Sequence, residues 1–143
     1  MITRGLNHVA LKVADLERSD RFYREQLGFE LLIKKGGMAF YSAGGHAHDL
    51  ALAEIGPADK PSRRMTGLFH LCFDVASEAD LRALHKDYSD KGLEPSMGVD
   101  HSIMRSFYLS DPDGNLLEFG VDTPRAQWSE EIWSGGKLFE FVS

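Results

Sequence analysis

Two stretches of this sequence repeat one pattern: GLNHVALKVA at residues 5–14 and GLFHLCFDVA at residues 67–76. Each is short, apolar or β-branched, and bounded by residues typical of turns, which predicts a β-strand. Apolar side chains at helical spacing follow each stretch, and both helical segments end at a glycine, Gly28 or Gly92, which can adopt the left-handed C-terminal conformation. The repeat predicts two modules of the same kind.

Strand-like segments continue each copy beyond its helix. Residues 38–43 and 49–55 flank a loop, and residues 102–109 and 115–121 flank the turn sequence DPDG. Each half therefore reads β-α-β-β-β. One helix leaves one face of a small sheet uncovered, and pairing two such sheets buries both faces. We predict an α+β fold in which two paired modules form an open, barrel-like cup.

These elements predict a single domain over residues 1–143. Its parts are module one at about 4–55, a linker at 56–66, module two at 67–121 and a C-terminal tail at 122–143.

Composition narrows the function classes. Among 143 residues, 16 are Lys or Arg and 22 are Asp or Glu, for a net charge of −6, which argues against binding nucleic acid or an anionic membrane. The chain shows neither a signal-peptide pattern nor an apolar run long enough to span a bilayer. The one cysteine, Cys72, fits a reducing compartment and is predicted to be a buried small apolar residue. We predict a cytoplasmic protein.

Three candidate metal ligands lie on predicted strands. His8 and His70 occupy the same position in the two copies, and Glu118 alternates with Leu117 and Phe119 in the last strand. A lone histidine in an apolar strand is more often a packed core residue, and Glu118 could face solvent. Taken together, two imidazoles and one carboxylate form the ligand set of non-haem Fe(II) enzymes, and Mn(II) or Zn(II) also accepts such ligands.

The sequence resembles the vicinal-oxygen-chelate superfamily, which includes glyoxalase I, extradiol ring-cleaving dioxygenases and fosfomycin-resistance thiol transferases. The resemblance rests on residues 6–10, 22–29 and 69–70, and above all on FYLSDPDGNLLE at residues 107–118. It implies a cup around a divalent metal held by His8, His70 and Glu118.

Further histidines resemble those of small catechol-2,3-dioxygenase-like members. That resemblance implies His48 as acid/base, His101 as donor to the substrate hydroxyl and Tyr108 as donor to substrate or intermediate, with Fe(II), a catechol-like small molecule and dioxygen. A catechol must lose a proton to bind a metal through both oxygens, and imidazole titrates near neutral pH. The alternatives are that His46 and His48 are solvated turn residues, that His101 lies in an exposed loop and that Tyr108 packs in the core.

Other functions remain open at this point. A fosfomycin-resistance-type transferase fits the ligand triad and the chain length. The resemblance to those enzymes would imply a threonine two residues after the first metal histidine, but this sequence has Ala10 there. A glyoxalase-like lyase typically has two glutamate ligands, which His8 with His70 does not match. A non-catalytic small-molecule binding protein on the same scaffold is the third alternative.

The aromatic residues predict a homodimer. Six large side chains exceed what a chain of this size is expected to cover by itself: Phe22, Phe29, Trp128, Trp133, Phe139 and Phe141. The alternative is that the tail folds back over its own sheet.

Overall fold

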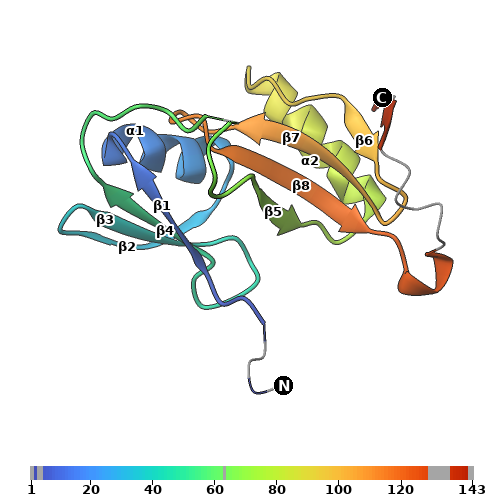
Figure 1. Cartoon of the computed structure of the whole chain (residues 1–143), viewed down its shortest axis with the longest axis horizontal. Coiled ribbons are helices and arrows are strands. Elements are labelled where there is room, and N and C mark those ends of the chain that lie inside the picture. The colour runs from blue at the N-terminus through green and yellow to red at the C-terminus, as the bar shows by residue number, and fades with distance from the viewer. Residues whose placement is uncertain (1, 3–4, 63, 129–135, 142–143) are drawn as a thin grey trace. The chain divides into compact units, whose positions relative to one another are not determined.

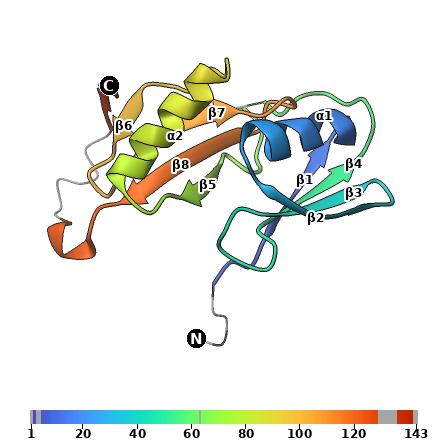
Figure 2. The ribbon, with the colours of Figure 1, turned by 180° about the vertical axis from the view of Figure 1, so that it is seen from behind.

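The computed structural model describes residues 2, 5–62, 64–128 and 136–141, and the chain divides into two compact units, Met1–Pro61 and Ser62–Ser143. Each unit contains one sheet and one long helical segment (Figures 1 and 2). The predicted α+β class and the β-α-β-β-β order of each half are confirmed.

The first unit contains a four-stranded sheet with the strand order β1-β4-β3-β2. Its strands are β1 (Val9–Val13), β2 (Glu30–Lys35), β3 (Met38–Ser42) and β4 (Leu50–Glu54). β1 and β4 run parallel and the other pairs run antiparallel. The helix α1 (Leu16–Asp20) and its continuation η1 (Arg21–Gln26) cover one face of this sheet (Figure 2).

Local sequence explains where this helix begins and ends. The Asp15 side chain caps the N-terminus by accepting a hydrogen bond from the Arg18 amide at 2.9 Å. η1 has the wider turns of a π-helix, in which the Leu27 amide donates to the Phe22 carbonyl. Gly28 then turns the chain with φ of 82°, which confirms the predicted glycine stop.

A buried carboxylate ties α1 to its sheet. Asp20 is 4% exposed and accepts hydrogen bonds from the Tyr41 hydroxyl at 2.8 Å and the Lys34 ammonium at 3.2 Å. Burial opposes its charged form, but the hydrogen bonds from Tyr41 and Lys34 and the positive charges of Lys34 and Arg24 together outweigh burial and hold the pKa of Asp20 below its usual value. Asp20 is therefore a charged anchor between the helix and strands β2 and β3.

This anchor predicts a specific acid sensitivity. A carboxyl whose pKa is lower in the folded protein stabilises the fold above its unfolded pKa, about 3.9, and loses that contribution as the pH falls through the folded value. We expect Asp20→Asn to lower the free energy of unfolding at neutral pH and to flatten its decline below about pH 4. Urea unfolding across this range measures both effects, with the exposed Asp59→Asn as control. Parallel curves for Asp20→Asn and the unmodified protein would show that Asp20 is no anchor.

The second unit has a five-stranded sheet with the order β5-β8-β7-β6-β9. Its strands are β5 (Leu71–Asp74), β6 (Gly98–Asp100), β7 (Met104–Ser110), β8 (Leu116–Asp122) and β9 (Lys137–Phe139). The helix α2 (Glu78–Asp90) covers one face, and a short 3₁₀ turn, η2 (Arg125–Gln127), follows β8 (Figure 1). Between α2 and the sheet, Phe73, Phe119 and Phe107 stack in series with centroids 5.5 and 5.3 Å apart.

The DPDG turn sets the register of β7 against β8. Asp111 is 4% exposed, and its side chain accepts hydrogen bonds from the amides of Asp113 and Asn115 and from the Asn115 side chain. The resulting antiparallel register places Tyr108 directly opposite Glu118. The strand predicted to begin at residue 102 begins instead at Met104, because Ser102 has φ of 66° and turns the chain.

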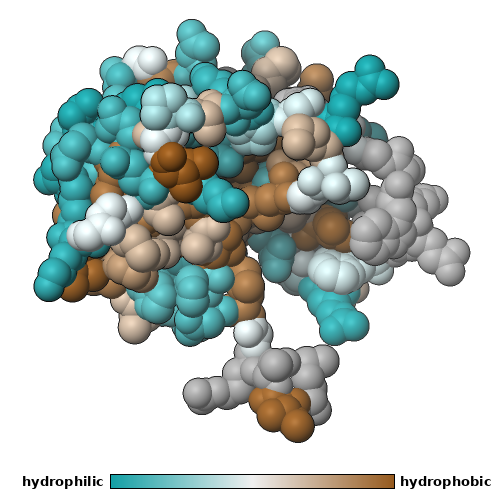
Figure 3. Space-filling model, turned by 60° about the vertical axis from the view of Figure 1, so that its left-hand side comes forward, coloured by the Kyte–Doolittle hydropathy of each residue, from teal (hydrophilic) through white to brown (hydrophobic). Residues whose placement is uncertain are grey.

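The apolar side chains that predicted a dimer have different surroundings. Phe22 and Phe29 are buried in the first unit, which corrects their use as interface candidates, and Trp133 lies outside the described residues. Phe141 stacks on His85 at 4.3 Å and β9 pairs with β6, so residues 136–141 return to their own unit and extend the edge of its sheet. On the face drawn in Figure 3, hydrophilic and hydrophobic side chains are mixed. The homodimer stays a prediction.

Among the described residues, none of the helices has the length and apolar character to cross a bilayer.

Candidate functional site

Glu118 is the centre of the candidate site in the second unit. Its side chain is 3% exposed. The adjacent residues Leu117 and Phe119, whose side chains point to the other face of the strand, are buried as well. The alternative that Glu118 points to solvent is therefore wrong. A buried carboxylate is costly without a compensating partner. In the described part of the chain, the ion-pairing groups within 4 Å of Glu118 are two imidazoles.

His70 is the nearer of these imidazoles. It immediately precedes β5, which pairs in parallel with β8 so that Cys72 lies opposite Glu118. The His70 Nε2 atom lies 2.9 Å from the Glu118 Oε2 atom. Its Nδ1 atom is buried and has no hydrogen-bond partner among the described residues. The sequence-predicted ligands His70 and Glu118 therefore converge.

This pair fits a divalent metal. Two ligand atoms that each lie about 2.1 Å from one ion, at right angles, are about 3 Å apart. The 2.9 Å separation of the His70 and Glu118 atoms matches that spacing. A cation would also compensate the buried charge of Glu118. Within the described residues no group of three or more His, Cys, Asp or Glu side chains is gathered for a metal, and His8, the third predicted ligand, belongs to the other unit.

His101 and Tyr108 lie beside the same carboxylate. The His101 Nε2 atom is 3.2 Å from the Tyr108 hydroxyl and 3.9 Å from Glu118 Oε1. The Tyr108 ring is 5.8 Å from the His70 ring. Burial, with the neighbouring Glu118, raises the pKa of Tyr108 to about 12. The structure thus gathers His70, His101, Tyr108 and Glu118 in one unit. The His101 side chain is about one-third exposed and Tyr108 is half-buried, so His101 is not in an exposed loop and Tyr108 is not packed in the core.

Cys72 departs from its predicted environment. The residue is exposed, which corrects the expectation of a buried core side chain. Its thiol nonetheless lies on the Glu118 side of the sheet, where partial desolvation and the Glu118 charge raise the pKa of Cys72 to about 12. At neutral pH it is a neutral thiol beside the candidate ligand.

In the first unit, His8 and His48 lie against each other with ring centroids 4.5 Å apart. His8 precedes β1 and is exposed, with its Nδ1 atom 2.8 Å from the Asn7 side-chain oxygen. Phe40 on β3 contacts His48 edge-on at 5.7 Å. Phe40 was not singled out from the sequence as a neighbour of the site. The alternation of side chains along β3 was the one sequence signal that could have placed it on the face toward His48.

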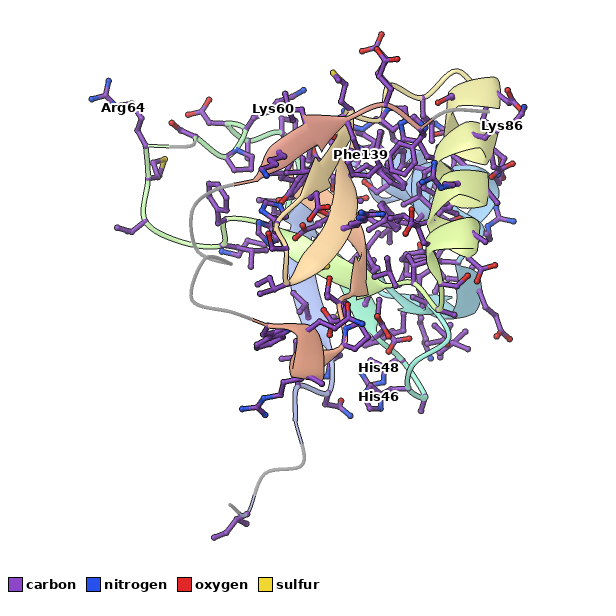
Figure 4. The ribbon with its side chains drawn as sticks, turned by 90° about the vertical axis from the view of Figure 1, so that its right-hand side faces the viewer. His46, His48, Lys60, Arg64, Lys86 and Phe139 are labelled. Atoms are coloured by element: carbon purple, nitrogen blue, oxygen red, sulfur yellow. The ribbon has the colours of Figure 1, made fainter. Side chains whose placement is uncertain are left out.

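The loop that carries His46 and His48 is held by a single carboxylate. The Asp49 side chain accepts hydrogen bonds from the amides of Ala43, Gly45 and His46. His46 is exposed, whereas His48 is half-buried, and Figure 4 labels both on this loop. The two histidines differ in their surroundings: His48, the predicted acid/base, contacts the predicted ligand His8, whereas His46 is exposed.

A separate polar hollow of about 550 Å³ lies where α2 begins. Its lining includes Glu78, Asp100, Arg105, Asp122 and Gln127. Arg105 is already paired with Glu78 and Asp100 at 2.8 and 3.0 Å. None of the residues that line this hollow is His70, His101, Tyr108 or Glu118. The candidate site is therefore identified by these four side chains and not by the hollow.

Comparisons with known proteins identify the family of this chain. The model of the Glyoxalase/Bleomycin resistance protein/Dioxygenase superfamily matches residues 5–119. Catechol-2,3-dioxygenase of Bacillus subtilis (strain 168) is 33% identical over 127 residues, which are 88% of this chain and 44% of that protein. Metallothiol transferase FosB of Lysinibacillus sphaericus (strain C3-41) is 29% identical over 86% of each chain.

Solved structures share the fold. A glyoxylase/bleomycin resistance protein/dioxygenase domain from Frankia sp. EAN1pec superposes with a TM-score of 0.74 at 27% identity, over 85% of this chain and 99% of that one. The chain spans only 44–65% of the length of the four dioxygenase relatives, one of which is named an iron-dependent extradiol dioxygenase from Rhodococcus jostii (strain RHA1).

Proposed function

The chain belongs to the glyoxalase/bleomycin resistance protein/dioxygenase superfamily, and on that premise we propose that it is an Fe(II)-dependent extradiol dioxygenase acting on a catechol-like ring. The observation that carries the proposal is the hydrogen-bonded His101–Tyr108 pair beside the buried Glu118. Two proton donors next to a candidate metal ligand suit a substrate with adjacent hydroxyl groups.

We propose His8, His70 and Glu118 as the metal ligands. His70 and Glu118 converge within the second unit, and the proposal requires the two modules to pair, within one chain or across a dimer, so that a His8 joins them. Fe(II) held there supplies Lewis-acid and redox chemistry and a template on which two reactants meet. Mn(II) or another divalent metal is compatible with the same ligands.

The chain's other residues then handle protons. His48, positioned by Phe40 and the Asp49-organised loop, takes the proton that the catechol loses on binding. His101 Nε2 and the Tyr108 hydroxyl are 3.2 Å apart, and in that hydrogen bond one group donates to the other. The pair therefore offers one donor at a time to a substrate oxygen or to the negative charge that develops during ring cleavage, and the second group donates when their mutual bond opens. Their hydrogen bond orients both groups toward the same side of Glu118, which reduces the reorganisation needed during reaction.

A thiol transferase is the competing function. The FosB relatives match this chain over 78–86% of their length, whereas the dioxygenase relatives extend well beyond it. The same His/His/Glu ligands serve either chemistry. A glyoxalase-like lyase or a non-catalytic binding protein would use the same scaffold without consuming dioxygen.

Oxygen uptake separates these functions. We expect the anaerobically reconstituted Fe(II) protein to consume dioxygen with at least one member of a panel of catechols and to form a yellow ring-fission product. Glu118→Ala protein treated with the same iron controls for free metal. Thiol-dependent loss of fosfomycin in the Mn(II) protein, without oxygen uptake across the panel, would establish the transferase instead. Substrate binding without turnover in any assay would indicate a binding protein.

A further inference from the structure

The C-terminal segment adds a strand to the sheet that carries the candidate site. β9 pairs antiparallel with β6, so that Phe139 lies opposite Gly98, Leu138 opposite Val99 and Lys137 opposite Asp100. This segment lies beyond residue 119, where the match to the superfamily ends. Figure 4 labels Phe139 on this strand. β9 therefore lies outside the residues that the superfamily model matches, and it covers the edge of β6.

β9 approaches β6 closely enough to require glycine at two positions. A Cβ atom on Gly98 would lie 2.4 Å from the Phe139 ring. A Cβ atom on Gly136 would lie 2.5 Å from Val99 Cγ1 and 3.1 Å from His101 Nδ1. Gly98 does not have a positive φ, so its backbone conformation does not demand glycine. What disfavours a side chain at both positions is the close approach of neighbouring atoms, and at Gly136 these atoms include the imidazole of His101.

The backbone of His101 is fixed independently. Its amide donates to the Met104 carbonyl at 2.9 Å. Asp100 accepts from the Ser102 amide at 2.8 Å and from Arg105 Nε at 3.0 Å, which closes the turn between β6 and β7. With the backbone held, the two side-chain torsions alone decide where the imidazole points.

Neighbours at opposite edges of the ring restrict those torsions. Gly136 lies beside the Nδ1 edge, where an added Cβ atom would come within 3.1 Å of Nδ1, and the Nε2 atom lies 3.2 Å from the Tyr108 hydroxyl and 3.9 Å from Glu118 Oε1. We infer that β9, through Gly136, is a positioning element that holds the imidazole of His101 against Tyr108 and Glu118. The purpose assigned to that orientation rests on the proposed function, but the orientation itself does not.

The test adds a methyl group at residue 136 without the collision at Val99. In Val99→Ala/Gly136→Ala the added Cβ retains its contact with the imidazole, 3.1 Å from Nδ1 and 3.2 Å from Cε1, so the ring must move or rotate by a few tenths of an ångström. Val99→Ala alone is the matched control. Leu138→Ala, at a side chain 68% exposed on β9, controls for changes to the strand.

Nuclear magnetic resonance of the full-length, metal-free chain provides the first readout. We expect the imidazole signals of His101 to shift, and the cross-relaxation between the His101 and Tyr108 rings to weaken, in the double variant relative to Val99→Ala. The signals of the exposed His46 should not change. His101 signals and cross-peaks identical to those of Val99→Ala would overturn the inference, whether or not the protein turns over a catechol.

Kinetics of the metal-loaded protein give the second readout. A displacement of this size is expected to lower kcat about three- to tenfold, since 1 Å of misplacement can cost about a hundredfold. The loss should vanish in a His101→Ala background, because the added methyl then has no imidazole to displace. An equal loss in that background would show a general structural effect and refute positioning.

A chain ending at Trp128 keeps the inference testable if the double variant does not fold. Loss of the cross-relaxation between the His101 and Tyr108 rings, with the backbone spectrum of β7 and β8 retained, is the expected result. Retention of that signal without β9 would refute the inference.

Discussion

Replacing Glu118 by alanine is expected to abolish stoichiometric binding of divalent metal while the fold is retained. The side chain is 3% exposed and its Oε2 atom lies 2.9 Å from His70 Nε2, so in the proposed site it would supply one of two converging ligand atoms. Losing a ligand from a three-residue set removes a coordinate bond and the negative charge that favours a dication. Metal analysis after desalting, with titration calorimetry, measures stoichiometry and affinity.

Asp122→Ala is the matched control, because Asp122 is an exposed carboxylate on the same strand and on the same side of the sheet as Glu118. It should bind metal as the unmodified protein does. Full-equivalent binding of unchanged affinity by Glu118→Ala would show that the proposed ligand set is wrong.

The stability of the metal-free protein gives this prediction a second, independent readout. Removing one member of a buried ion pair usually destabilises a protein because the other charge is left unpaired. Here the neighbouring groups are imidazoles whose side chains are 30% and 32% exposed, so water can solvate them once the carboxylate is removed. We therefore expect the free energy of unfolding of the metal-free protein not to fall in Glu118→Ala. A large loss of stability would mean that Glu118 has mainly a structural role.

Replacing His48 by glutamine is expected to lower kcat by about 10²–10⁴-fold, the usual range for loss of a general acid/base. The His48 ring lies 4.5 Å from His8, at the proposed edge of the metal site, and is held by Phe40. Glutamine preserves hydrogen bonding but cannot accept and return a proton at neutral pH. Metal content should remain at one equivalent, because His48 is not one of the proposed ligands.

His46→Gln is the control for that experiment. His46 lies on the same Asp49-organised loop and contributes to it through its backbone. Its amide donates a hydrogen bond to Asp49 and its carbonyl accepts one from Ser42, so replacing the side chain should leave the loop intact. Its turnover should match that of the unmodified protein. Equal losses in the two variants would point to disturbance of the loop, and full activity of His48→Gln would remove His48 from the mechanism.

Features decided by neighbouring residues could be predicted from the sequence. The two copies at residues 5–14 and 67–76, the glycine helix stops and the DPDG turn depend on local periodicity and on the φ angles that a residue permits. Those features place His8 and His70 just before equivalent strands and Tyr108 near Glu118. The α+β class and the membership of the superfamily follow from them.

The surroundings of individual side chains were decided only by the tertiary structure. Alternation by itself favoured a Glu118 that faces solvent, and parallel pairing of β5 with β8 decided for the site by bringing His70 to it. Cys72 looked like a core residue and is exposed, while Phe22 and Phe29 looked like interface residues and are buried. Gly136 has no local sequence signal, since its need for glycine comes from a strand pairing with residues 98–100. Periodicity and turn preferences act between residues a few positions apart, whereas burial and partners depend on which distant strands pair and in which register, and that is settled only when the whole sheet forms.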